Sequence, residues 1–171
     1  MKKLVKNYLA KLQENDKKGF SLVELIIVMA IMAILVGIVA SQVIPYMEKS
    51  RQAKDQQVIS AICTDIVSAV AQSGESCTGG IDTLGNLENI ANAQTVTEFQ
   101  DLRSGTAIAT IETNCKGQLK SKLMKGGDIY INIDNATGKI QVWVPAQDGK
   151  GTGTASTAPT AGSKNLVESE G

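Results

Sequence analysis

Residues 17–40, KKGFSLVELIIVMAIMAILVGIVA, join a basic pair to a long apolar run that carries a single carboxylate, Glu24. The apolar segment extends from Leu22 to Ile44, and a helix of that length spans about 35 Å, which exceeds the roughly 30 Å of a hydrocarbon core. The run therefore predicts a membrane-spanning helix. Glu24 needs an explanation, because a carboxylate at mid-membrane costs roughly 2.5–3.5 kcal/mol, less near one end.

The charges around this run are unevenly distributed. Residues 1–19 hold six lysines against Glu14 and Asp16, whereas the remaining chain has 11 basic and 15 acidic side chains. An excess of positive charge ahead of an apolar run marks the end that stays in the cytoplasm. An ordinary secretory signal would begin in the same way, with a weak cleavage site at residues 38–40, and a plain membrane anchor also fits the length. Neither alternative explains Glu24.

The stretch from Lys17 to Leu25 resembles the class III signal of type IV pilins and pseudopilins: basic residues, Gly19, Phe20 and Glu24 ahead of an apolar helix. The resemblance implies that a prepilin peptidase cleaves between Gly19 and Phe20, that the new Phe20 amine is N-methylated, and that the helix is retained. It also implies that Glu24 neutralises the Phe20 amine of a neighbouring subunit in a filament. Residues 1–19 would then be a cleaved leader and 20–45 the membrane and filament-core helix.

Gly37 and Pro45 are the helix-breaking residues of this segment. Proline removes a backbone donor and crowds the preceding turn, so we expect a break or kink between them. The proline lies about one turn later than is usual in the family that the sequence resembles.

Residues 46–171 are expected to form a soluble head of the type IV pilin fold, α+β, in which a helix packs on three or four antiparallel strands. Apolar residues recur at helical spacing from Ile59 to Val70, which predicts an amphipathic helix over 46–73 that ends at Ser73-Gly74. A connecting loop (74–104, with a short helix at 97–102), a sheet (about 105–145) and a flexible tail (146–171) follow. The expected strands are Thr106–Glu112, Asp128–Ile133 and Lys139–Val144, with a turn at 135–138 and Trp143 on the outer face.

Three cysteines allow at most one intramolecular bridge. Cys63 lies beside the apolar stripe and is predicted to be a buried thiol, whereas Cys77 and Cys115 follow element ends, where a disulfide could pin the loop. No cysteine has metal-site spacing, and the acidic residues Asp128, Asp134 and Asp148 lack the compact spacing of a calcium loop. We therefore expect no metal and no cofactor.

Composition also limits the function. The chain has no histidine and no nucleophile–base arrangement, so we expect no enzyme, and its acidic main part argues against specific nucleic-acid binding. The expected function is that of a structural subunit, the major pilin, of a type IV pilus for adhesion, motility or aggregation. Its partners would be further copies of itself, the prepilin peptidase, the pilus assembly machinery and the cytoplasmic membrane before export to the cell surface. A pseudopilin of a secretion or DNA-uptake system, and a membrane-anchored binding or sensor domain, are the alternatives.

Overall fold

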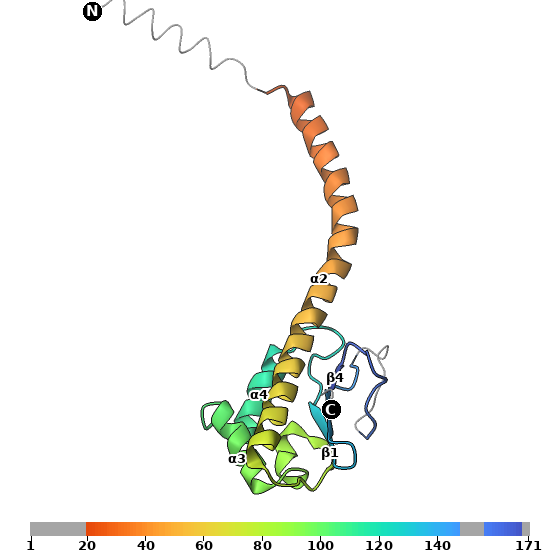
Figure 1. Ribbon diagram of the computed structural model, residues 1–171. Coiled ribbons are helices and arrows are strands. Elements are labelled where there is room, and N and C mark those ends of the chain that lie inside the picture. Colours follow the sequence, from red (N-terminus) through yellow and green to blue (C-terminus); the bar gives the residue numbers. More distant parts are fainter. Residues whose placement is uncertain (1–19, 148–155, 169–171) are drawn as a thin grey trace, which may run out of the picture. The chain divides into compact units, whose positions relative to one another are not determined.

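The computed structural model describes residues 20–147 and 156–168, so the leader and part of the tail lie outside the described chain. The fold is α+β, with a long helix packed on a four-stranded antiparallel sheet, as in the type IV pilin fold. The chain divides into two units, one ending at Pro45 and one from Tyr46 to Gly171. We call residues 20–45 the arm and residues 46–171 the head. The elements, coloured along the sequence in Figure 1, are α2 (Leu22–Ser73), β1 (Gly80–Thr83), the 3-10 helix η1 (Leu84–Asn89), α3 (Ala93–Leu102), α4 (Ile108–Gln118), β2 (Tyr130–Asp134), β3 (Lys139–Trp143) and β4 (Leu166–Glu168).

Helix α2 belongs to both units and is assigned as helical throughout. It continues through Gly37 and Pro45, and a kink or a break there in an assembled filament stays a prediction. Pro45 cannot donate a hydrogen bond to the preceding turn, where the Ser41 hydroxyl donates to the Ile38 carbonyl at 2.8 Å. The helix ends at Ser73 as expected, because Gly74 adopts a left-handed conformation with φ of +62°.

The sheet has the strand order β1-β2-β3-β4, and every neighbouring pair is antiparallel. Ile131 pairs with Val142 and Ile133 with Ile140, which places these side chains on one face, as the alternation of the sequence predicted. The turn between β2 and β3 is also where it was expected. Asp134 accepts hydrogen bonds from the Ala136 amide and the Thr137 hydroxyl there.

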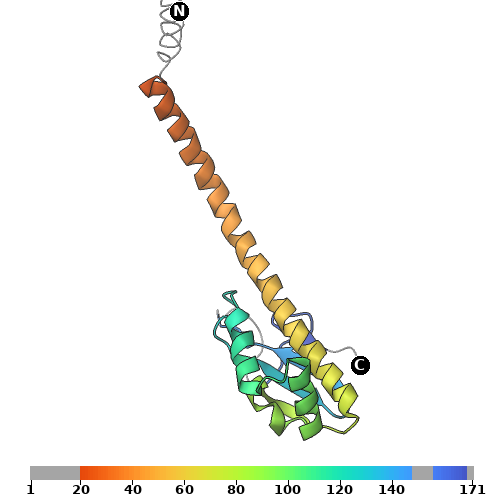
Figure 2. The ribbon, with the colours of Figure 1, turned by 90° about the vertical axis from the view of Figure 1, so that its left-hand side faces the viewer.

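The head contains the hydrophobic core. The apolar stripe of α2 packs into it through Ile59, Ile62 and Ile66, all fully buried. The core-facing side chains of β2 and β3 complete it, together with Leu84 and Leu87 of η1. Figures 1 and 2 show α3 and α4 packed beside the final turns of α2, next to the sheet. The predicted amphipathic helix is therefore confirmed.

The expected strand Thr106–Glu112 is wrong, because this stretch begins α4 instead. Its β-branched residues favour a strand locally, but Ile111 and Cys115 are four residues apart and both are buried, which is helical spacing. The short helix expected at 97–102 does form, as the second half of α3. That helix starts earlier because the Asn92 side chain caps it, accepting a hydrogen bond from the Thr95 amide at 2.7 Å.

The two outer strands come from segments that the sequence assigned to a loop and a tail. Strand β1 lies in the interval 74–104, and β4 lies in the tail, where Leu166 pairs with Trp143. Trp143 was expected on an exposed face but is fully buried. Its ring stacks on Tyr130, with 5.9 Å between the centroids, and the returning C-terminal segment adds the buried Leu166 on the same sheet face. The tail is thus part of the fold over 156–168.

The three cysteines are buried free thiols, and the bridge considered between Cys77 and Cys115 is not formed here; the pairing stays a prediction. The Cys77 sulfur lies 3.8 Å from the Thr95 hydroxyl, whereas the Cys115 sulfur accepts a hydrogen bond from Arg103 at 3.4 Å. Burial, assisted by the negative charge of Glu168, raises the pKa of the Cys63 thiol to about 11. Cys63 is therefore protonated at neutral pH, as expected of a buried thiol.

Candidate functional site: the N-terminal end of the arm

The first turn of α2 is closed by two hydrogen bonds. The Ser21 amide donates to Oε2 of Glu24 at 3.0 Å, and the Val23 amide donates to the Ser21 hydroxyl at 3.4 Å. We call this arrangement a capping box, in a variant whose serine hydroxyl accepts from the second residue of the helix instead of the third; both bonds satisfy backbone amides that have no partner within the helix. Glu24 thus has a function within its own chain: it stabilises the start of the arm helix.

The capping hydrogen bond leaves Glu24 able to accept another donor. An ionised carboxylate offers about four lone-pair sites on two oxygens, and the bond to Ser21 uses one of them. The negative charge also lies in the first helical turn, where the positive end of the helix dipole stabilises it. Glu24 can therefore accept a cationic amine at this end of the helix while it still caps the helix.

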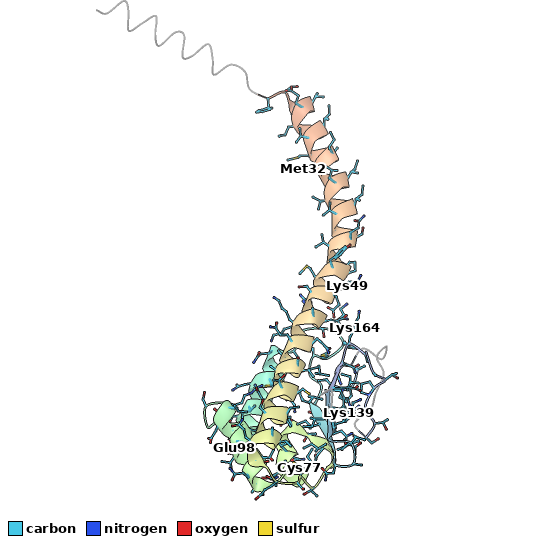
Figure 3. The ribbon with its side chains drawn as sticks, in the orientation of Figure 1. Met32, Lys49, Cys77, Glu98, Lys139 and Lys164 are labelled. Atoms are coloured by element: carbon cyan, nitrogen blue, oxygen red, sulfur yellow. The ribbon has the colours of Figure 1, made fainter. Side chains whose placement is uncertain are left out.

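The arm is exposed throughout. Every residue from Phe20 to Pro45 is classed as exposed, and Phe20 itself is 88% exposed. Met32, labelled in Figure 3, projects away from the helix as its neighbours do. In the part of the chain that the structure describes, α2 is long and apolar enough to cross a membrane, by length and composition. So much exposed apolar surface requires lipid or another protein as its environment.

Two further carboxylates, which the sequence analysis missed, hold α2 within the head. Asp55 is fully buried and accepts hydrogen bonds from the backbone amides of Lys120 (2.9 and 3.1 Å) and Ser121 (2.8 Å). Glu48 accepts from the Lys122 amide at 2.6 Å. Both carboxylates thus fix the loop that follows α4 to the side of α2. Their partners are backbone amides 65–74 positions away, which leave no pattern in the sequence.

Comparison with known families identifies the N-terminal segment. Residues 15–40 match the prokaryotic N-terminal methylation motif. The chain carries a class III pilin signal. The match spans 26 of the 171 residues and includes Gly19, which lies outside the described residues, as well as Phe20 and Glu24. No curated protein and no solved structure matches the chain.

In its N-terminal motif and in its fold the chain is similar to type IV pilins and pseudopilins. The motif implies processing by a prepilin peptidase, and with the apolar helix it indicates that the precursor is anchored in the membrane. Among the described residues, no group of histidine, cysteine, aspartate and glutamate side chains could hold a metal ion. The matched motif overlaps the capped, charged end of α2 and much of the apolar surface that follows it.

Proposed function

We propose that this protein is the major subunit of a type IV pilus, polymerising through its arm into a surface filament. The observation that supports the proposal is the arrangement at residues 20–24. One acidic side chain lies one turn after the cleavage position, at the start of a fully exposed apolar arm. Lipid can cover the apolar surface before assembly. Neighbouring arms can cover it afterwards.

Glu24 would give this packing its axial register. After cleavage, Phe20 carries a free α-amine, and an arm beside another arm can place that cation against the Glu24 carboxylate of its neighbour. A carboxylate that lacks a counter-charge is unfavourable in an apolar environment, and the contact removes that penalty. The capping box strengthens the proposal, because it fixes the Glu24 side chain at the helix start before a neighbour arrives.

The test compares Glu24→Gln with Glu24→Ala and Ser21→Ala in cells that make the protein. Glutamine also serves as the third residue of a capping box, so Glu24→Gln removes the charge and retains the cap. We expect both Glu24 variants to be cleaved and methylated at Phe20 but to yield at least about tenfold fewer filaments. The reason is that a hydrogen bond to a charged group contributes about 1.5–3 kcal/mol, and every subunit loses it. Ser21→Ala loses only a cap, so we expect it to assemble.

The measurements are the mass of the N-terminal peptide and electron microscopy of material sheared from the cell surface. Methylated Phe20 at the N-terminus, long filaments for the unaltered protein and few for Glu24→Gln would support the proposal. Filaments of normal number with Glu24→Gln would contradict the register role. A mature form that starts after the apolar run, or filaments that remain as short stubs, would contradict a pilus subunit and favour secretion or a pseudopilus.

A further inference from the structure

The cations of the head fall into two groups. Among the described residues outside the end where α2 enters the head, each cation has a carboxylate partner: Arg103 with Asp65 (2.6 Å), Lys116 with Asp128 (2.7 Å) and Glu112 (2.9 Å), and Lys139 with Glu168 (2.6 Å). The others are exposed, and in the described chain the one ion pair among them joins Arg51 to Glu48 at 3.8 Å. We call this second group the basic collar: Lys49, Arg51, Lys54, Lys120, Lys122, Lys125 and Lys164.

Hydrogen bonds within the head bring the collar together from three separate segments. Asp55 and Glu48 bind the backbone of residues 120–122 and so place that lysine-rich loop beside the first turns of α2 in the head. The C-terminal segment joins them because Lys164 donates to the Gln52 side chain at 3.3 Å. Figure 3 shows Lys49 and Lys164 at one end of the head, and Glu98 and Cys77 at the other.

The collar follows the arm directly in the chain. Tyr46 comes just after the apolar run, is 70% exposed and has the Lys49 ammonium 5.6 Å from its ring centroid. Tyrosine is enriched at both boundaries between a membrane and water. Lys49, Arg51 and Lys54 lie within about 15 Å of helix length from Pro45, which is comparable with the roughly 10 Å range of electrostatic interactions at moderate salt.

We propose that the basic collar binds the anionic phospholipid headgroups of the membrane that holds the arm. The described segments that carry the collar, 48–55, 120–125 and 162–166, hold seven positive charges against the two negative charges of Glu48 and Asp55. Both of these carboxylates already accept hydrogen bonds from backbone amides. Clustered lysine and arginine side chains at a membrane surface bind anionic lipid, and the binding weakens as the salt concentration increases. The collar would hold the base of the head at the lipid surface until the subunit enters a filament. The inference depends on the membrane anchoring of the precursor.

The test uses the full chain reconstituted in phosphatidylcholine vesicles that contain trace nitroxide-labelled phosphatidylglycerol or phosphatidylcholine. Electron paramagnetic resonance gives the relative association of the two lipids with the protein. The variant is Lys120→Gln/Lys122→Gln/Lys125→Gln, and the matched control is Lys120→Arg/Lys122→Arg/Lys125→Arg. Both keep the backbone amides that Asp55 and Glu48 bind, and the leader lysines contribute equally in all forms.

We expect the preference for phosphatidylglycerol to fall about threefold in the glutamine variant and to persist in the arginine control. We also expect the preference of the unaltered protein for phosphatidylglycerol to fall in 0.5 M salt to about that of the glutamine variant, because salt screens the collar charges. An unchanged preference in the glutamine variant would overturn the proposal, and so would equal loss in both variants. Unchanged lipid preference together with lost filaments would assign the collar to contacts with a second copy instead.

Failure of the anchor is distinguishable from failure of the collar. Alkaline carbonate leaves a spanning protein in the vesicles and extracts one that is only bound to the surface. Extraction of the unaltered chain would overturn both the membrane anchor and this proposal, whereas a retained chain with no phosphatidylglycerol preference would overturn the collar alone.

Discussion

The arm exposes its apolar surface, whereas the head buries it. In the arm every residue from Phe20 to Pro45 is exposed, and the hydrogen-bonded pair Ser21 and Glu24 lies at its first turn. In the head the apolar side chains of α2 are buried at Ile59, Ile62 and Ile66 against the sheet and the short helices. One helix, Leu22–Ser73, therefore contains both a stretch that its own chain covers and a stretch that it leaves uncovered.

The head and the arm obtain their stability from different sources. The head has a hydrophobic core within residues 59–166, so we expect it to fold without other copies. Nothing in the described chain buries the arm, so we expect it to gain favourable free energy from lipid or from neighbouring arms. Substitutions in the head should therefore change its free energy of unfolding, whereas substitutions in the arm should change membrane anchoring or assembly.

The largest expected effect comes from matched truncations in the two halves of α2. Ile62→Ala removes a fully buried side chain and should lower the free energy of unfolding of the head by about 3–4 kcal/mol. Ile34→Ala, at a residue that is 64% exposed, should leave that free energy unchanged. Urea unfolding of the full chain in detergent, followed by fluorescence of the single tryptophan, Trp143, measures both. An equal loss in both variants would contradict the independence of the head.

A smaller effect is expected at the buried carboxylate that ties α2 to the loop after α4. Asp55→Ala leaves the amides of Lys120 and Ser121 without their partner and should cost about 2–3 kcal/mol in the same assay. Asp55→Asn keeps an acceptor oxygen and should cost less. A neutral result for Asp55→Ala would mean that water replaces the carboxylate, and that the contact positions the loop without stabilising the head.

The smallest effect is a pH dependence at the edge of the sheet. The hydrogen bond from Lys139, with that from Gln141, lowers the pKa of Glu168 from its usual 4.5. Because the folded-state pKa is the lower one, the contribution is present above about pH 4.5 and is lost as the pH falls through the folded value. It should be below about 1 kcal/mol, since the pair is partly exposed.

The measurement compares urea midpoints at pH 7 and pH 3 for the unaltered protein and Glu168→Gln. The variant should show a smaller change between the two pH values. An identical change in both proteins would mean that Glu168 contributes no pH-dependent stability.

The elements with strong periodicity were predictable from the sequence, and those defined by distant partners were not. The stripe of α2 and the β2–β3 hairpin carry their own signals, in the spacing of Ile59, Ile62 and Ile66 and in the turn that ends with Gly138. Strand β4 has three residues and forms because Leu166 meets Trp143. Strand β1 has four residues and depends on its pairing with β2 in the same way.

The residues of the candidate site also differ in whether their signal is local in the sequence or depends on distant partners. The N-terminal motif is local, so Phe20 and Glu24 could be found from the sequence, whereas the hydrogen bond from the Ser21 amide to Glu24 was found only in the structure. Asp55 could not be found, because in the sequence it is one acidic residue in a polar stretch. The helix at 108–118 was mistaken for a strand because β-branched residues dominate its start, and packing of Ile111 and Cys115 overrides that preference.

Strand β4 lies well after β3 in the chain, so the edge of the sheet is completed in a fixed order. Residues 166–168 emerge after the other three strands, and they pair with the outer edge of β3 and place Leu166 on the sheet face of Trp143. Until they have been translocated, β3 presents an open row of amides and carbonyls, the kind of edge that recruits foreign strands. The arm precedes all four strands in the chain. In a precursor anchored by the arm, an intermediate with this open edge would therefore be confined to the plane of the membrane rather than free to diffuse.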